Sequence, residues 1–157
     1  MSRKILVAID ASRCARQALD EALREAGLRH ATLEILHVID YGFLKRQDDH
    51  LNLAKVRSEH VMMANALLER AAKLARDAGI DHSVQLIDDM ATLGDVSGRV
   101  VQYAQDSGAE LVVAGTHGHT GLLRVVLGSV AEELVRHCPV PVLVIREGMN
   151  APVTPPL

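Results

Sequence analysis

A chain of 157 residues with a formal net charge of −3 is long enough for one domain and has no general attraction for nucleic acid or anionic membranes. The aromatic residues are two tyrosines and one phenylalanine, too few to stack the bases of a single strand. No run approaches the roughly 20 apolar residues of a membrane span, so neither nucleic acid binding nor membrane insertion is expected.

The two cysteines, Cys14 and Cys138, are isolated thiols outside any Cys-x-x-Cys pair, which suits a reducing compartment. The apolar run at residues 5–9 resembles the start of a signal peptide. Asp10 ends it too early, and no small-residue cleavage site follows. We therefore expect a cytoplasmic protein.

Apolar runs alternate with helical patterns through the first half of the chain. Residues 5–9 predict a short buried strand, and an apolar helical stripe begins near Ser12 and is expected to end at Gly27. Residues 32–38 predict the second strand, and the polar residues 41–50 predict a loop. A long helix is expected to follow, with Leu53 and Met63 on its buried stripe and its end at Gly79.

The second half continues the alternation. Residues 82–87 predict a third, more polar strand at a sheet edge, and Asp95 is expected to cap a helix that stops at Gly108. Residues 111–114 and 142–146 predict the last two strands, with a helix from Val130 to about His137 between them. We expect one domain over residues 1–147 and a flexible tail over residues 148–157.

Strands that alternate with helices predict an α/β, Rossmann-like fold: a five-stranded, mostly parallel sheet with helices on both faces. With the strand order 3-2-1-4-5, the winding reverses between the first and fourth strands. Ligands bind such sheets beyond the carboxyl ends of the strands at that point. Asp10, Val38 and Gly115 would meet there.

A glycine frame follows the fourth strand: Gly115-Thr-His-Gly118, nine residues, then Gly128-Ser129. Glycines let backbone amides approach an anion, and a helix start adds unpaired N–H groups and a favourable dipole. We expect the amides near Gly118 and Gly128 and the Ser129 hydroxyl to hold phosphate. The alternative for Ser129 is a capping box with Glu132, which needs no ligand.

This frame resembles the nucleotide-binding signature of the universal stress protein family. Residues 4–12, 36–38 and 94–95 agree with the family pattern, and the resemblance runs from about residue 3 to residue 146. It implies an α/β domain that acts in stress response or regulates a protein partner. It also implies a homodimer joined through the last strand, Val142–Ile145, whose apolar edge favours pairing in any case.

The resemblance also implies a ligand, ATP with Mg2+, with ADP and AMP as alternatives. It places Asp10 near the ribose and the metal-bound phosphates, Val38 at the adenine through its backbone, and Ala8 in the base pocket. Gly115 would approach the ribose, while Gly118, Gly128, Ser129 and the Val130 amide would contact phosphate. The sequence leaves two alternatives open: Asp10 as a cap of the first helix, and Val38 as a plain core residue.

Other polar residues near the strand ends have less defined roles. Arg124, inside the glycine loop, reaches a phosphate or is simply exposed. Asp88 and Asp89 repel a triphosphate, hold a cation, or are solvated. His117 and His119 lack the carboxylate or cysteine framework of a zinc site. Cys138 is expected to be a structural cysteine.

Three kinds of function fit these patterns. The first is a regulatory module that holds ATP and changes its partner contacts with occupancy. The second is a slow ATP hydrolase or phosphoryl-transfer enzyme, which the chain supports less because it shows no assured general base and no lysine in the loop. A dimeric scaffold without nucleotide is the third. A receiver domain using Asp10 with Asp88 or Asp89 fits poorly, and P-loop and dinucleotide motifs are absent.

Overall fold

The computed structural model describes residues 3–46, 52–117, 127–147 and 155–157. Its centre is a parallel five-stranded sheet in the order β3-β2-β1-β4-β5. The strands are β1 (Lys4–Ala8), β2 (Thr32–Val38), β3 (His82–Ile87), β4 (Leu111–Gly115) and β5 (Val142–Ile145). The α/β fold and the strand order expected from the sequence are confirmed.

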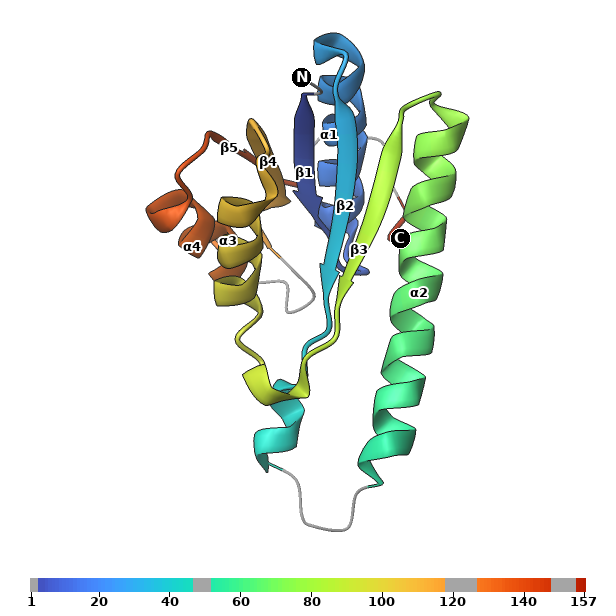
Figure 1. Ribbon diagram of the computed structural model, residues 1–157, viewed down its shortest axis with the longest axis vertical. Helices are drawn as coiled ribbons and strands as arrows, with labels where there is room; N and C mark the ends of the chain where they lie inside the picture. The colour runs from blue at the N-terminus through green and yellow to red at the C-terminus, as the bar shows by residue number, and fades with distance from the viewer. Residues whose placement is uncertain (1–2, 47–51, 118–126, 148–154) are drawn as a thin grey trace.

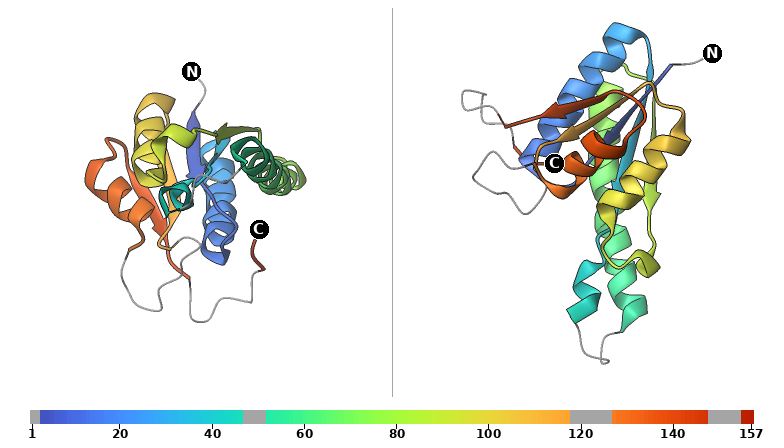
Figure 2. Two further views of the ribbon diagram at one scale, coloured as in Figure 1. Left: turned by 90° about the horizontal axis from the view of Figure 1, so that it is seen from below. Right: turned by 90° about the vertical axis from the view of Figure 1, so that its left-hand side faces the viewer.

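Helices cover both faces of the sheet. α1 (Arg13–Arg29) and α2 (Leu53–Asp77) lie on one side, and α3 (Val96–Ser107) and α4 (Ser129–His137) lie on the other (Figures 1 and 2). Two short 3-10 turns, η1 (Gly42–Arg46) and η2 (Met90–Thr92), follow β2 and β3. Within the described residues, no helix has the length and apolarity needed to cross a membrane.

Each face of the sheet has its own apolar layer, because side chains alternate along a strand. On the α1 and α2 side, Val7, Ile35 and Leu19 belong to the first layer. On the α3 and α4 side, Leu6 and Leu36 belong to the second layer. Burying a leucine of this kind contributes about 1.5–3 kcal/mol, so the two layers account for much of the stability. Leu157, which the sequence places in the tail, packs against the first layer.

α1 begins as expected and ends later than expected. The Ser12 hydroxyl oxygen accepts the N–H of Ala15 at 3.1 Å and caps the helix. The predicted stop at Gly27 is wrong, because the helix continues to Arg29 and ends where His30 takes a left-handed conformation with φ of 51°. The His30 N–H donates to the carbonyls of Ala26 and Gly27. A histidine therefore occupies the left-handed position at the end of the helix that is usually a glycine.

The long helix α2 is confirmed, but its first half extends beyond the sheet (Figure 1). Leu53 and Met63, expected on the buried stripe, are therefore 52% and 70% exposed. Burial begins at Ala64, which joins Ile39 and Tyr41 in a small third cluster beside η1 and η2. The predicted loop at residues 41–50 thus contains a helical turn at Gly42–Arg46.

The turn η1 and the residues just after η2 approach each other closely at two glycines, Gly42 and Gly94. Gly94 has a φ of +94°, and a Cβ on it would lie 2.6 Å from Cα of Gly42. Asp40 holds the first turn, accepting the N–H of Gly42 at 2.8 Å. The chain after β2 is therefore fixed against the chain after β3, near the carboxyl ends of those strands.

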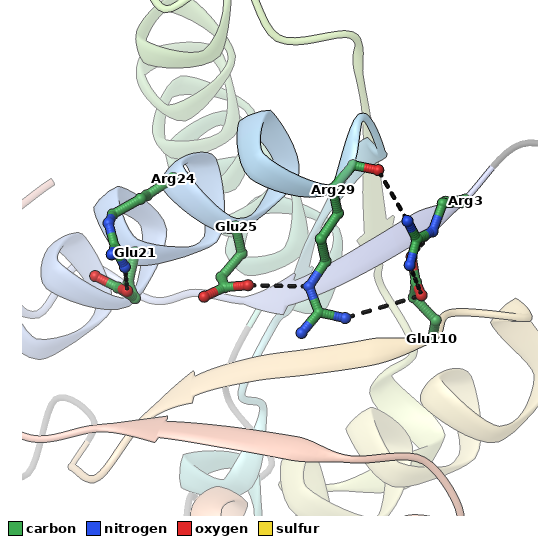
Figure 3. A network of polar contacts seen from close by, with 6 residues as sticks. All are labelled: Arg3, Glu21, Arg24, Glu25, Arg29 and Glu110. Atoms are coloured by element: carbon green, nitrogen blue, oxygen red, sulfur yellow. Dashed lines mark hydrogen bonds and ion pairs between the residues drawn. The ribbon is translucent and has the colours of Figure 1, made fainter.

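An ion-pair network closes the opposite end of the sheet (Figure 3). Arg3 donates two hydrogen bonds to Glu110, at 2.8 and 3.0 Å, and Arg29 lies 3.8 Å from the same carboxylate. Arg29 also pairs with Glu25 at 2.9 Å. These contacts join the start of β1, the end of α1 and the approach to β4 at the amino ends of the strands.

A buried carboxylate lies beneath α3. Glu34 of β2 is 6% exposed, pairs with Nζ of Lys4 at 2.9 Å and accepts the hydroxyl of Tyr103. Burial and then the Glu34 carboxylate raise the pKa of Tyr103 to about 12. The charge is buried with partners on two sides, as an interior carboxylate requires.

Candidate functional site

A cavity of about 620 Å³ lies at the carboxyl ends of β1, β2 and β4. The residues that the sequence predicts for a ligand site line it wherever the structure describes them: Ala8, Asp10, Val38, Gly115, Gly128, Ser129 and Val130. Gly118 and Arg124 lie outside the described residues. The reversal of winding between β1 and β4 brings these distant segments together, as the strand order predicts.

At the carboxyl ends of the strands, the cavity extends over both faces of the sheet. Val38 and Val100 of its wall belong to the apolar layer under α3 and α4, whereas Ile9 and Leu67 belong to the layer under α1 and α2. α2 contributes a stripe that includes His60, Met63, Leu67 and Arg70. Sequence reasoning missed this wall, although the spacing of three and four residues along one helix face was visible.

The start of α4 supplies the part of the cavity suited to an anion. Gly128 is the N-cap, and its own N–H donates to the Thr116 carbonyl at 2.6 Å. The Gly128 amide is therefore engaged within the protein. A helix leaves its first-turn N–H groups without intrahelical partners, and here those belong to Ser129, Val130 and the residue that follows. The helix dipole adds to their attraction for negative charge.

The capping-box interpretation of Ser129 is wrong. Gly128 takes the N-cap position in an extended conformation, and α4 has no side-chain capping bond. Ser129 is the first helical residue and is exposed, and its hydroxyl makes no hydrogen bond to the described part of the chain. Within the described residues, therefore, no capping role explains a serine at position 129.

Asp10 shapes the turn between β1 and α1. Its Oδ1 accepts the N–H of Ser12 at 2.9 Å, and Ser12 in turn caps the helix. Asp10 is therefore not the helix cap, which was the alternative left open by the sequence. It lines the cavity from the end of β1. Asp10 belongs to no group of three potential metal ligands within the described residues, so Mg2+ would need oxygens from the ligand.

Gly115 has a packing reason to be glycine. A Cβ at this position would lie 2.7 Å from Sγ of Cys14 and 3.2 Å from its Cβ. Cys14 is buried and donates its thiol to the Ile145 carbonyl at 3.1 Å. The close approach of α1 to β4 thus excludes a side chain at residue 115, whether or not a ligand also comes near.

His37 is a cavity residue to which sequence reasoning gave no role. It follows Leu36 in β2, and its Nδ1 lies 2.8 Å from the Ile9 carbonyl. Burial lowers its pKa; the hydrogen bond to Ile9 and the charge of Asp10 act in the opposite direction. A histidine inside an apolar strand was the signal that could have drawn attention to it.

The acidic pair Asp88 and Asp89 is held by arginines. Asp88 accepts Arg57 at 2.8 Å and the Tyr41 hydroxyl at 2.5 Å, and Asp89 accepts Arg99 at 2.9 Å. Burial alone would raise the pKa of Asp88, but the hydrogen bonds from Tyr41 and Arg57 hold it below its ordinary value. Neither aspartate lines the cavity. The pair therefore stabilises the turns after β2 and β3.

The histidine beside the glycine frame joins a short polar chain. Nδ1 of His117 lies 2.9 Å from Oγ1 of Thr116, which is 3.6 Å from Sγ of Cys14. His117 lines the cavity, and His119 lies outside the described residues. Cys138 is a partly buried free thiol at the end of α4.

Comparison with known proteins relates this sequence and its fold to one family. The model of the Universal stress protein family matches residues 1–146. Universal stress protein YxiE of Bacillus subtilis is 29% identical over 154 residues, covering 93% of this chain and 100% of that protein. The solved structure of MJ0577 from Methanocaldococcus jannaschii has a TM-score of 0.79 at 26% identity, covering 96% of this chain and 99% of that one.

A third relative was solved with a ligand. The universal stress protein from Archaeoglobus fulgidus in complex with dAMP has a TM-score of 0.66 at 25% identity. The match covers 91% of this chain and 97% of that one.

Proposed function

The chain belongs to the universal stress protein family, and we propose that it is a cytoplasmic regulatory module that binds an adenine nucleotide in the cavity. One observation carries the proposal. The first turn of α4, with the hydroxyl of Ser129 unengaged by the described residues, lines the same cavity as Asp10 and Val38. Anion-binding amides and an apolar wall in one cavity suit a phosphate joined to a base.

The phosphates would lie against the first turn of α4. The Ser129 hydroxyl and the amides of Ser129 and Val130 would donate to them, and Gly118 and Arg124 would complete this contact. The Gly128 amide has a smaller part than the sequence suggests, since it donates to Thr116. Gly128, which has no side chain, would instead leave the space beside the first turn of α4 open for close approach of the phosphates.

The nucleoside would occupy the wall formed by the strand ends. The backbone of Val38 would meet the adenine, with Ala8 beneath it, and Gly115 would lie near the ribose. Asp10 would lie near the ribose and hold Mg2+ together with phosphate oxygens, because Mg2+ commonly uses one or two carboxylates plus substrate phosphates. We propose ATP with Mg2+ as the ligand, with ADP and AMP as alternatives. The dAMP complex of the Archaeoglobus fulgidus protein supports the adenine nucleotide class.

The regulatory role would be exerted through protein contacts. We propose a homodimer through the edge of β5, because no strand among the described residues pairs with Val142–Ile145 on its outer side. A further protein partner would read nucleotide occupancy from this dimer. Binding without turnover is favoured because Arg70 is the sole lysine or arginine among the described residues that line the cavity. It stands on α2, which covers the face of the sheet opposite to α4.

Nucleotide carried through purification tests the proposal directly. Freshly purified protein is denatured, and the released small molecules are separated by chromatography. Calorimetry with ATP, ADP and AMP, with and without Mg2+, then gives the preference. No heat with any of them at millimolar concentration would refute nucleotide binding. Measured ADP release above roughly 1 s⁻¹ would make the protein an enzyme rather than a holding module.

Two variants locate the site. Ser129→Ala removes a hydroxyl with no bond in the described structure, so it should weaken nucleotide binding without lowering the melting temperature. Gly128→Val should block approach to the first turn of α4. The matched control is Ser83→Ala, an exposed serine on β3 that does not line the cavity. If Ser129→Ala, Gly128→Val and the control all bind nucleotide equally well, the ligand does not bind at the first turn of α4.

A further inference from the structure

His37 combines three properties that point to a ligand contact. It lines the cavity, it is only partly buried, and one edge of its ring is fixed by the backbone. It stands on β2 next to Val38, on the face that carries Ile35. It therefore reaches the cavity from the side of α1 and α2, away from the first turn of α4.

The hydrogen bond to Ile9 decides the tautomer. A carbonyl oxygen is only an acceptor, so Nδ1 of His37, at 2.8 Å from it, must carry the proton. In a neutral ring the other nitrogen, Nε2, is then an acceptor with a lone pair. Because the pKa of His37 is lowered by burial, the neutral ring dominates at neutral pH.

Nε2 is accessible and has no hydrogen-bond partner in the part of the chain that the structure describes. The hydrogen bond to Ile9 is the one that His37 makes within the described residues. In the same part of the chain, no fully buried side-chain nitrogen or oxygen lacks a partner. Nε2 must therefore reach solvent, and the space that the ring borders is the cavity.

We propose that Nε2 of His37 accepts a hydrogen bond from the nucleoside part of the bound ligand, which makes His37 a specificity-determining residue. This inference rests on the proposed nucleotide binding. The donor is an N–H or O–H group, and an adenine nucleotide offers two sources: the amino group of the base and the hydroxyls of the ribose. A ligand with a carbonyl or a hydrogen at the same place would leave Nε2 unpaired.

The test compares AMP with analogues that lack one donor each. IMP has a carbonyl where AMP has the amino group of the base. The 2′-deoxy and 3′-deoxy forms of AMP lack one ribose hydroxyl each. Calorimetry at pH 8, where even an ordinary histidine is neutral, is done on the wild type and on His37→Asn and His37→Gln. Asparagine keeps an N–H near the Ile9 carbonyl but is too short to place an acceptor at the Nε2 position, whereas glutamine offers a carbonyl near that position.

We expect the wild type to bind AMP about three- to tenfold more tightly than the analogue that lacks the donor facing His37. His37→Asn should lose that preference and bind AMP correspondingly more weakly, and His37→Gln should retain more of it. The analogue that loses its penalty in His37→Asn identifies the donor. The Nε2 nitrogen resonance of His37 should also shift when AMP is added to the wild type.

Two outcomes would overturn the inference while leaving nucleotide binding intact. Either the wild type binds AMP and all three analogues equally, or His37→Asn keeps the preferences of the wild type. A wild type that binds no adenine nucleotide would instead refute the proposed function itself. Thermal unfolding of both variants separates a lost contact from a lost fold, because a structural defect lowers all affinities together and leaves their ratios unchanged.

Discussion

A Cβ on Gly115 would lie 2.7 Å from Sγ of Cys14, closer than real side chains approach. Gly115→Ala should therefore destabilise the protein by about 1–3 kcal/mol, the usual effect of overpacking a dense interior. Urea unfolding of the variant and the wild type measures the difference.

The same contact provides an internal control. Cys14→Ala removes Sγ, but the backbone carbon and Cβ of Cys14 remain at 3.1 and 3.2 Å. The double variant should recover part of the loss caused by Gly115→Ala, in a double-mutant cycle with a favourable coupling. Additive effects would mean that helix α1 and strand β4 are not in the contact described.

The two tyrosines should ionise late. The pKa of Tyr41 is raised to about 12 by burial, then by its hydrogen bond to Asp88, and that of Tyr103 is raised to about 12 by burial and Glu34. An unfolded tyrosine ionises near 10, so the unfolded state loses protons first as the pH rises. The stabilisation is present below pH 10 and is lost between about 10 and 12.

The ultraviolet absorbance of tyrosinate during a pH titration measures the ionisation of the two tyrosines. Little phenolate should form at pH 10.5, and its appearance above that should accompany unfolding. Tyr103→Phe leaves Glu34 with one donor fewer, which should destabilise the protein by about 1–3 kcal/mol. Free ionisation of both tyrosines near pH 10 in the folded protein would contradict the described contacts.

His37 makes folding sensitive to mild acid. Its pKa is lowered in the folded protein, chiefly by burial, so the unfolded state binds its proton more readily. Stability is then complete above the ordinary value of 6.5 and falls as the pH drops through it. Denaturant unfolding at several pH values between 8 and 5 should show a steeper loss for the wild type than for His37→Asn. If the free energy of unfolding depends on pH in the same way in both proteins, His37 is not the source of the acid sensitivity.

The edge strand β5 should control association. All of its residues are partly exposed, and Val144 is not among the side chains packed against either main core layer. Val144→Lys should therefore keep the fold but convert the proposed dimer to a monomer, because a charge on an edge strand opposes pairing. Sedimentation equilibrium at micromolar concentration measures the mass. Val84→Lys on the opposite edge strand is the control and should leave the mass unchanged.

The fold could be predicted because local patterns and global topology agree. Alternating apolar runs identified the strands, and the ends of helices at Ser12, Asp95 and Gly108 followed residue preferences that the structure repeats. The failures lie where tertiary contacts override such preferences. Gly27 stays helical, and His30 takes the left-handed position that glycine usually fills.

The site was predicted less completely than the fold. The meeting of the ends of β1, β2 and β4 could be inferred from the strand order, which predicts that Asp10, Val38 and Gly115 lie together, and all three line the cavity. His37 was missed because the role proposed for it depends on a hydrogen bond to Ile9, a residue 28 positions away in the chain. The wall from α2 was missed because helix periodicity does not reveal which stretch extends past the sheet.

The cavity borders both apolar layers, which lie on opposite faces of the sheet. A molecule bound there would contact the layer under α1 and α2 on one side and the layer under α3 and α4 on the other, and so link the two layers. Occupancy would then raise the melting temperature of the whole domain in one cooperative step, so the same event that loads the protein would also protect it from heat and proteases.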